Sequence, residues 1–268
     1  MTRTSIPGWL AGLIGGVSLI VLWWIFAVTA FRPAEGTTFT PVPTPAAVFD
    51  WLILQGNIAG AASVFAPTLM AAGIGYLWGN GIALLLATIV LLFPKTETVI
   101  TQIAVVSYCL PIVAIGGISV VVLGGAKSPG DPSATAIFLA ALVCVFTTVV
   151  GSILGFTSAD KASLDVVRVY GGGRWTQLRK VRLVAALPSI LNALQIAVPT
   201  AFLGAVLGEY LGGITAGVGP TLIRLQGQLD SAGVWSVFLL CAVFALLAYG
   251  LVGLLIRFVT PWVAGKAA

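Results

Sequence analysis

The sequence contains no histidine and very little charge. Only 8% of its 268 residues are Asp, Glu, Lys or Arg, 59% are hydrophobic, and the mean hydropathy is +1.10. A soluble protein carries roughly 25% charged residues. The lack of histidine excludes imidazole catalysis and most zinc or haem sites. A water-soluble fold could not cover this much apolar surface, so the composition indicates a polytopic membrane protein.

Cysteine is scarce, and a phosphate-binding loop is absent. All three cysteines fall inside apolar runs, which favours small buried side chains over a disulfide framework. No G-x-x-x-x-G-K-[S/T] motif occurs: Gly171-Gly172-Gly173 is followed by Arg174. We therefore expect no catalytic residue, no metal site and no bound cofactor in this chain.

Six apolar runs are long enough to cross a bilayer, which requires about 20 residues. They predict an all-α fold made of one transmembrane domain over residues 1–268, with spans at about 9–31, 61–93, 98–123, 134–156, 189–211 and 232–256. The first run is too long for a signal-peptide core, so we interpret it as a retained span.

The segments between these runs are expected to be connectors. Residues 32–46 are rich in Pro and Thr, and residues 46–55 can form a short interfacial helix anchored by Trp51. The charge-free stretch 58–93 predicts one long or bent span, or two re-entrant pieces. Residues 124–133 and the glycine-rich stretch 212–231 are expected to be loops.

Lysine and arginine are distributed asymmetrically across the predicted spans. Three of them, Arg32, Lys127 and Arg224, fall on one side of the membrane. The other side carries Arg3, Lys95, Lys161, Arg168, Arg174, Arg179, Lys180, Arg182, Arg257 and Lys266. Positive residues mark the cytoplasmic side, so both termini and the loop 158–188 are expected in the cytoplasm. The net charge of +5 thus indicates topology and contact with membrane lipid, not nucleic acid.

The loop between the fourth and fifth runs is basic and jointed by glycine: DKASLDVVRVYGGGRWTQLRKVRLVAALP, residues 160–188. Residues 159–169 can form one helix, which Gly171–Gly173 would end, and residues 174–184 a second. Leu187-Pro188 would then open the fifth span. The loop predicts a cytoplasmic helix–turn–helix, acting either as a topological connector or as a docking surface for a cytoplasmic partner.

The loop resembles the signature of permease subunits of ABC importers, which reads Glu-Ala-Ala, then Gly, nine residues, and Ile-x-Leu-Pro. The matching positions in this chain are Asp165, Val166, Val167, Gly171, Val181, Leu183 and, in place of the proline, Val184. The flanking GGGRWTQLRKVRLVAALPSILNALQIAV and FLGAVLGEYLGG are similar to the nitrate/sulfonate/taurine-type branch of that family. The resemblance covers roughly residues 40–262.

This resemblance implies a non-hydrolysing permease subunit in a bacterial inner membrane. Two permeases would assemble with two cytoplasmic ATPase subunits, which bind ATP and Mg, and with an extracytoplasmic substrate-binding protein. A loop helix at Lys161–Trp175 would enter a cleft of the ATPase and move the attached spans between inward-open and outward-open states. The diverged signature favours a heterodimer with a second, different permease. The coupling residues implied are Lys161, Leu164, Asp165, Arg168, Tyr170, Gly171, Arg174 and Trp175.

Several roles in the loop stay open. Asp165 would pair with a cation of the ATPase, cap its own helix, or form a surface salt bridge. Tyr170 and Trp175 would anchor the partner or pack on their own subunit.

Four residues are candidates for the translocation path. Glu209, near the end of a span, would line an outer gate, pair with Arg224, or sit among lipid head groups. Pro111 would free carbonyls toward a cavity or simply kink its helix. Asn192 and Gln195 would face the central cavity or the seam between permeases.

An ion-coupled secondary transporter or channel is the main alternative. Such proteins show inverted repeats or intramembrane charges, whereas this chain has no visible repeat and one borderline glutamate. Few charged path residues favour a small, polar solute, whose identity the sequence leaves open.

Overall fold

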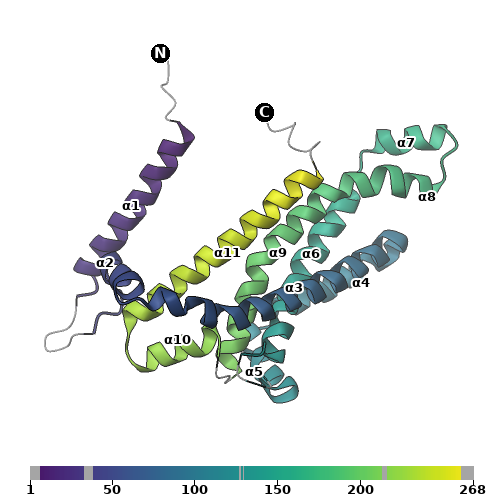
Figure 1. Cartoon of the computed structure of the whole chain (residues 1–268). Coiled ribbons are helices and arrows are strands. Elements are labelled where there is room, and N and C mark those ends of the chain that lie inside the picture. The colour runs from purple at the N-terminus through teal and green to yellow at the C-terminus, as the bar shows by residue number, and fades with distance from the viewer. Residues whose placement is uncertain (1–6, 33–38, 127, 129, 213–215, 261–268) are drawn as a thin grey trace, which may run out of the picture. The chain divides into compact units, whose positions relative to one another are not determined.

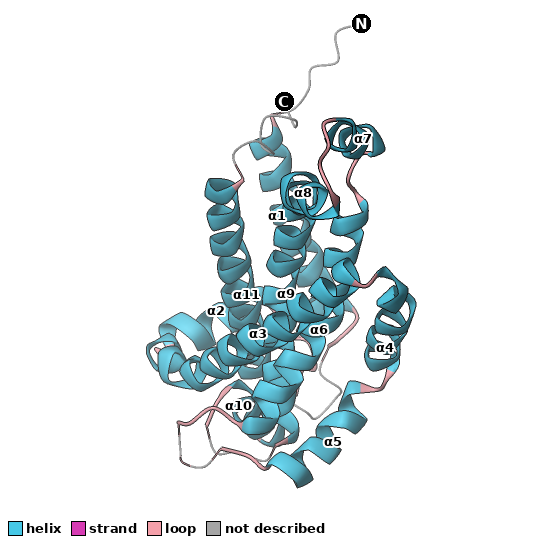
Figure 2. Cartoon of the chain, turned by 90° about the vertical axis from the view of Figure 1, so that its right-hand side faces the viewer, coloured by secondary structure: helices cyan, strands magenta, loops and turns pink. Residues whose placement is uncertain are grey.

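The structure is a computed structural model that describes residues 7–32, 39–126, 128, 130–212 and 216–260. Arg3, Lys127 and Lys266, used above to predict topology, lie outside the described residues, as do parts of the connector 32–46 and of the stretches 124–133 and 212–231. Helices account for all regular secondary structure in the described ranges, which contain no β-strand (Figures 1 and 2).

Five described helices are long and apolar enough to cross a membrane, and a bent pair makes a sixth candidate. The helices are α1 (Gly8–Thr29), α2 (Pro45–Phe49), α3 (Ala61–Leu92), α4 (Glu97–Cys109), α5 (Ile112–Leu123), α6 (Ala134–Thr157), α7 (Lys161–Val169), α8 (Arg174–Gln177), α9 (Leu183–Leu211), α10 (Val218–Gly227) and α11 (Ser231–Val259). The stretch 58–93 therefore forms one continuous helix after a short 3-10 turn, and two re-entrant pieces are not formed.

The chain divides into two compact units. The first comprises Met1–Ala62 and Thr221–Cys241, and the second comprises Ser63–Pro220 and Ala242–Ala268. In the first unit, α1 is held against the start of α11 by stacked indoles of Trp23 and Trp235, whose ring centroids lie 5.5 Å apart. The predicted interfacial helix is present as α2 and a wide helical turn, Asp50–Leu54.

The core of the second unit is a seam of small residues between α6 and the antiparallel α9. Gly151 and Gly155 of α6 face alanines of α9, while Gly204 and Gly208 of α9 face the first turns of α6. A Cβ atom on Gly151 would lie 2.5 Å from the Ala193 Cβ, closer than any real contact. Small residues at this spacing let two backbones approach closely, and such packing stabilises helix pairs in lipid.

Helix α3 joins the same seam through a glycine pair one turn apart. Cβ atoms on Gly75 and Gly79 would collide with the backbone of α6 around residues 137–141. One turn further on, the Thr148 hydroxyl of α6 donates a hydrogen bond to the Asn80 side-chain oxygen. The sequence analysis did not find this polar link, because neither residue departs from the surrounding apolar pattern by its charge.

The third apolar run is broken much more sharply than a simple kink. Helices α4 and α5 meet at Leu110–Pro111 at an angle of 89° (Figure 2). The Leu110 backbone is extended, because the proline ring disfavours helical geometry in the preceding residue. The interpretation of Pro111 as a plain kink is therefore wrong.

Two other expectations for secondary structure are also wrong. The second loop helix does not end before Pro188, because α8 continues through a π-helical turn, Leu178–Arg182, into α9 without a break. The stretch 212–231 is not simply a loop, because it contains α10. Its glycines and proline suggested a loop, but Gly219 and Pro220 fall in the first turn of α10, where a helix tolerates both residues.

The seam can be tested within α3, where packed and open glycines alternate. Gly79→Ala is expected to lower the free energy of unfolding by about 1–3 kcal/mol, because the new methyl group overpacks the contact with α6. Gly81→Ala is the matched control, because no atom lies within 4 Å of its Cβ position. This control should be neutral or stabilising by up to about 1 kcal/mol, since alanine favours a helix.

Thermal unfolding of both variants in detergent measures the difference. Equal melting temperatures for Gly79→Ala and Gly81→Ala would contradict the seam.

Candidate functional site

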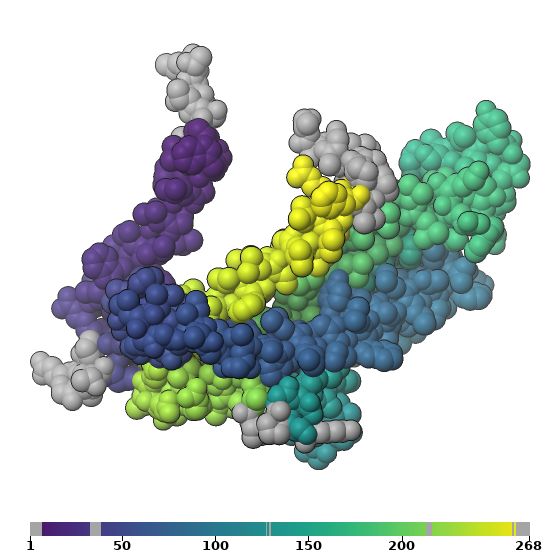
Figure 3. Space-filling view, in the orientation of Figure 1, coloured from purple at the N-terminus to yellow at the C-terminus, as the bar shows by residue number. Residues whose placement is uncertain are grey.

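The basic loop forms a hairpin of helices at one end of the second unit (Figures 1 and 3). Helix α7 ends in a Schellman motif, with Gly171 in the left-handed conformation at φ +78°. The Gly172 N–H donates to the Val167 carbonyl (2.8 Å) and the Gly171 N–H to the Arg168 carbonyl (3.0 Å). The motif reverses the chain within residues 170–173, so the predicted helix Lys161–Trp175 is in fact α7, a turn, and the start of α8.

The tip of the hairpin is exposed and apolar. Val169 and Tyr170 are 84% and 87% exposed, so Tyr170 does not pack on its own subunit. Leu164 is half-buried, and its carbonyl accepts a hydrogen bond from the Gln177 side chain (3.2 Å), which holds α7 against α8. We call Val166, Val169 and Tyr170 the loop tip.

Asp165 lies in the middle of α7 and forms a surface ion pair. Its Oδ1 is 3.7 Å from a guanidinium nitrogen of Arg168, and both side chains are exposed. The helix cap is at Asp160, whose side chain makes no capping hydrogen bond. Of the three roles considered for Asp165, the cap is therefore wrong. The ion pair contributes little by itself, since exposed pairs are worth about 0–1 kcal/mol.

A hollow of about 430 Å³ lies between the hairpin and the end of α3. Arginines from both arms of the hairpin line it, namely Arg168, Arg174 and Arg182, together with Trp175. Its remaining lining consists of Leu91, Leu92, Pro94, Gln177 and Leu178. We call this the arginine hollow. The structure thus separates the predicted coupling residues, because Tyr170 and Gly171 lie at the turn, whereas Arg168, Arg174 and Trp175 line the hollow.

Two adjoining hollows of about 360 and 370 Å³ run along α6 and α9 and share Thr147. Leu110 and Ile112, on either side of Pro111, line the first, and Asn192 lines the second. Hydroxyl groups recur along both hollows, from Ser107, Tyr108, Thr147, Ser189 and Thr200. We call the two hollows together the hydroxyl groove. Its lining includes no Asp, Glu, Lys or Arg among the residues that the structure describes.

Gln195 does not share the groove with Asn192. Its side-chain amide donates to the Tyr249 carbonyl of α11 (3.3 Å) and packs against Gly253. The two residues are three positions apart on α9, yet Asn192 lines the groove and Gln195 contacts α11. Sequence analysis missed the hydroxyls on α6 and α9, although threonines inside an apolar run are a usable signal.

Glu209 is completely buried and holds the start of α10. Its Oε2 accepts hydrogen bonds from the Thr68 hydroxyl of α3 (2.8 Å) and from the Gly219 N–H (3.2 Å). The Thr68 Oγ in turn accepts from the Val218 N–H (3.0 Å). A carboxylate at this position satisfies N–H groups that the first turn of a helix leaves without partners and complements the helix dipole.

The predicted placements of Glu209 at the lipid head groups or beside Arg224 are therefore wrong. Arg224 lies in the last turn of α10, whereas Glu209 binds the first turn. The other oxygen, Oε1, has no hydrogen-bond partner within the described ranges. Thr68, the residue that links this carboxylate to α3, was not found from the sequence.

The network around Glu209 predicts a specific cost for losing the Thr68 hydroxyl. Thr68→Val leaves the Val218 N–H without a partner and removes one of the two hydrogen bonds to the Glu209 carboxylate, which should cost about 1–3 kcal/mol of stability. Thr68→Ser keeps the hydroxyl and should retain most of it. Thr88→Val is the control, because that hydroxyl bonds only to the Leu84 carbonyl of its own helix (2.7 Å).

Thermal unfolding in detergent compares the three variants. Equal melting temperatures for Thr68→Val and Thr88→Val would show that the network does not stabilise the fold.

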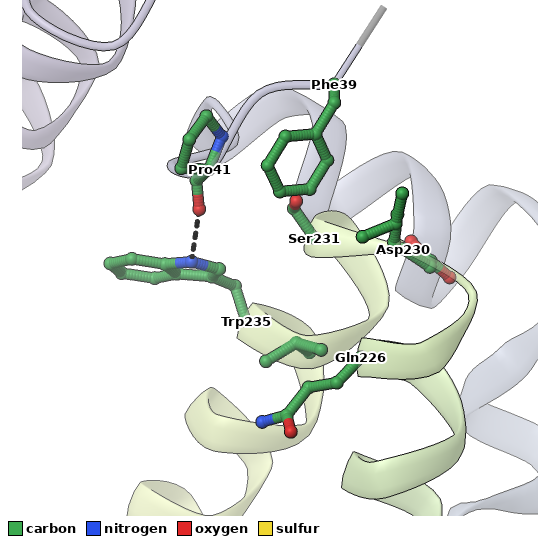
Figure 4. Close-up of a pocket in the computed structure, with 8 residues that line it drawn as sticks. Phe39, Pro41, Gln226, Asp230, Ser231 and Trp235 are labelled. Carbon is green, nitrogen blue, oxygen red and sulfur yellow. Dashed lines mark hydrogen bonds between the residues drawn. The ribbon is translucent and has the colours of Figure 1, made fainter.

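A smaller hollow of about 210 Å³ lies within the first unit and is shown in Figure 4. The Trp235 indole N–H donates to the Pro41 carbonyl (3.2 Å) at its edge. Asp230 accepts from the Trp51 indole (2.8 Å) and from the Gly233 N–H (2.9 Å), so it caps the start of α11. These bonds tie the connector to α11, and we assign the hollow a structural role.

Comparison with known proteins identifies a family for most of the chain. Residues 79–265 match the family described as binding-protein-dependent transport system inner membrane component, and the match includes the loop, the groove and Glu209. The chain is 26% identical over 258 residues to the putative aliphatic sulfonates transport permease protein SsuC of Bacillus subtilis (strain 168), covering 95% of this chain and 88% of that relative.

Two further matches are more distant. The formylaminopyrimidine transport permease protein ThiX of Halalkalibacterium halodurans is 24% identical over 195 residues, covering 73% of this chain and 75% of that relative. Among solved structures, a bacterial ABC transporter involved in the import of the acidic polysaccharide alginate contains a chain with a TM-score of 0.59 and 14% identity, covering 92% of this chain and 96% of that one. This structural similarity shows that the two chains share a fold, and it shows nothing more.

Proposed function

Because the chain belongs to the family of binding-protein-dependent transport system inner membrane components, we propose that the tip of its α7–α8 hairpin is the contact through which a cytoplasmic ATPase drives solute import. The family itself fixes the broader role. The chain is a permease subunit of an ABC importer, a multi-pass membrane protein and not an enzyme. Family membership also implies ATPase subunits, a substrate-binding protein and a second permease as partners.

One observation carries the proposal: two large side chains stand almost fully exposed at the end of a short helix, α7, between the long apolar helices α6 and α9. Val169 and Tyr170 are 84% and 87% exposed, although the neighbouring Leu164 and Val167 are half-buried between the helices. Lys161 and the Asp165–Arg168 pair surround them with charge. An apolar centre with a charged rim is the usual composition of a protein interface.

The hairpin is also built to transmit force. Helix α8 runs without a break into α9, so a displacement of the hairpin acts directly on the helix that carries Asn192 and Glu209. The Schellman motif fixes the turn, and the Gln177–Leu164 hydrogen bond joins the two arms. A lateral push on the tip would therefore move α9 as a rigid body, which is a common mode of conformational switching.

For the translocation path we propose the hydroxyl groove on α6 and α9. It offers hydroxyls and one amide, from Asn192, between apolar walls, with the broken α4–α5 pair at one side. Such a lining suits a small, polar or weakly charged solute. The names of the relatives, which include transport of aliphatic sulfonates and of formylaminopyrimidine, are compatible with that class.

The arrangement of the complex is part of the same proposal. The hairpin and both termini would lie in the cytoplasm, where two ATPase subunits bind ATP and Mg. The second permease would be a diverged partner, since Asp165, Val166 and Val167 depart from the Glu-Ala-Ala of the signature.

A charge placed at the tip should release the ATPase. Val169→Asp buries a carboxylate in the proposed interface, and we expect at least a tenfold loss of co-purified ATP-hydrolysing subunit, about 1.4 kcal/mol or more. The measurement is ATPase activity and mass spectrometry of the complex purified through this chain. Leu229→Asp is the control, because Leu229 is also exposed but lies in the turn between α10 and α11.

Two results would contradict the proposed contact. One is an unchanged yield of ATPase with Val169→Asp. The other is an equal loss with Leu229→Asp, which would point to general destabilisation of the complex.

Water access tests the proposed path without a known substrate. In a background with Cys109, Cys144 and Cys241 replaced by alanine, Thr147→Cys and Asn192→Cys should react with a membrane-impermeant maleimide in cells. Leu246→Cys is the control, because Leu246 is exposed on an apolar face of α11. If the maleimide labelled Leu246→Cys but did not react with Thr147→Cys or Asn192→Cys, the path would lie elsewhere.

A further inference from the structure

We propose that the arginine hollow is a binding site for the head group of an anionic phospholipid. The hollow brings together three guanidinium groups, Arg168 from α7 and Arg174 and Arg182 from the second arm of the hairpin. Guanidinium groups present paired N–H donors that match phosphate oxygens. The proposal does not depend on the ATPase contact, because none of the three loop-tip residues lines the hollow, and Arg168 is the one residue that the hollow shares with the charged rim of the tip.

The donors in the hollow are largely free to bind a ligand. Arg174 and Arg182 form no ion pair within the described part of the chain. Arg168 is held only by the exposed pair with Asp165, at 3.7 Å. Asp165 is not among the lining residues, and neither are Asp160 and Glu97, the other acidic groups nearest in sequence to the hairpin and to the end of α3. The hollow therefore carries a local excess of positive charge.

The position of the hollow favours a lipid over a soluble anion. Its floor includes Leu91 and Leu92, the last residues of an apolar helix that carries no charge over 32 residues. Its other wall ends at Arg182, the last charged residue before the apolar run of α9. Both boundaries between charged and apolar sequence thus meet at this hollow, as expected at the surface of a bilayer.

Apolar groups beside the arginines can accommodate the acyl part of the lipid. Leu92 and Phe93 are exposed at the end of α3, and Trp175 in the hollow is 64% exposed. Tryptophan is enriched at the level of lipid head groups, because its ring is apolar and its N–H is polar. Basic pockets beside transmembrane helices on the cytoplasmic side are suited to anionic head groups.

The helical geometry makes the arginines of the hollow distinct from the other basic residues of the loop. Arg174, Leu178 and Arg182 recur every four residues and so share one face of the helix, which lines the hollow. Arg179 and Lys180 lie between them in the sequence but are exposed and do not line it. This difference provides a control with the same change in net charge.

The test is a titration of the purified full chain in detergent with phosphatidylglycerol, followed by native mass spectrometry. The triple variant Arg168→Gln, Arg174→Gln, Arg182→Gln should bind phosphatidylglycerol about tenfold more weakly or worse, since it removes all three positive charges of the hollow. The triple variant Lys161→Gln, Arg179→Gln, Lys180→Gln should stay within about twofold of the unmodified chain.

Further arms identify the ligand. Phosphatidylcholine should bind more weakly than phosphatidylglycerol, and millimolar inorganic phosphate alone should not displace the bound lipid. Arg182→Lys should bind more tightly than Arg182→Gln and more weakly than the unmodified chain, because lysine keeps the charge but not the paired donors; this distinguishes loss of charge from misfolding. Thermal unfolding of each variant checks that the fold is intact.

Three outcomes would overturn the proposal. Equal loss in both triple variants would show a diffuse effect of surface charge. If inorganic phosphate displaced the bound lipid, at phosphate concentrations that saturate the hollow, the hollow would be a site for a soluble anion. Unchanged lipid binding in the hollow variant, together with loss of the co-purified ATPase, would make the hollow part of the protein interface.

Discussion

Close contact between glycine-bearing helix faces determines the arrangement of the second unit. Four glycines let α6 and α9 approach until the backbone of one helix contacts side-chain methyl groups of the other, namely Gly151, Gly155, Gly204 and Gly208. Gly75 and Gly79 bring α3 against α6. Lipid offers no hydrophobic force between helices, so this packing, with bonds such as Thr148–Asn80, must hold the bundle. The hydroxyl groove, the buried Glu209 and the hairpin are all attached to helices that this seam positions.

Much of the architecture could be predicted from the sequence, because it depends on local signals. Apolar length predicted the five long apolar helices, the glycines after Val169-Tyr170 predicted the hairpin turn, and Pro111 marked where the third run bends, although not how sharply. The loop signature identified the family. Other features depend on contacts distant in sequence: Thr68 and Glu209 are 141 positions apart, and Gln195 turned out to face α11 because Tyr249 accepts its hydrogen bond. The uninterrupted helix through Pro188 and the arginine hollow likewise require the three-dimensional packing.

The hairpin combines two kinds of surface that the sequence did not separate. The tip presents aliphatic and aromatic groups to the solvent, whereas the inner side gathers three guanidinium groups above the apolar end of α3. We infer that one side serves a protein partner and the other the membrane surface. A lipid bound under the hairpin would hold its base at the bilayer while the ATPase displaces its tip, so that movement passes into α9.

The measurement that tests the account most directly is site-specific photocrosslinking from position 170 in intact cells. With a photoreactive amino acid in place of Tyr170, the account predicts a crosslinked product that contains an ATP-binding subunit, while the same group at Gln228, at the end of α10, gives none. Crosslinks from position 170 to lipid alone, or equal capture of the ATPase from position 228, would contradict the assignment of the hairpin tip as the coupling contact.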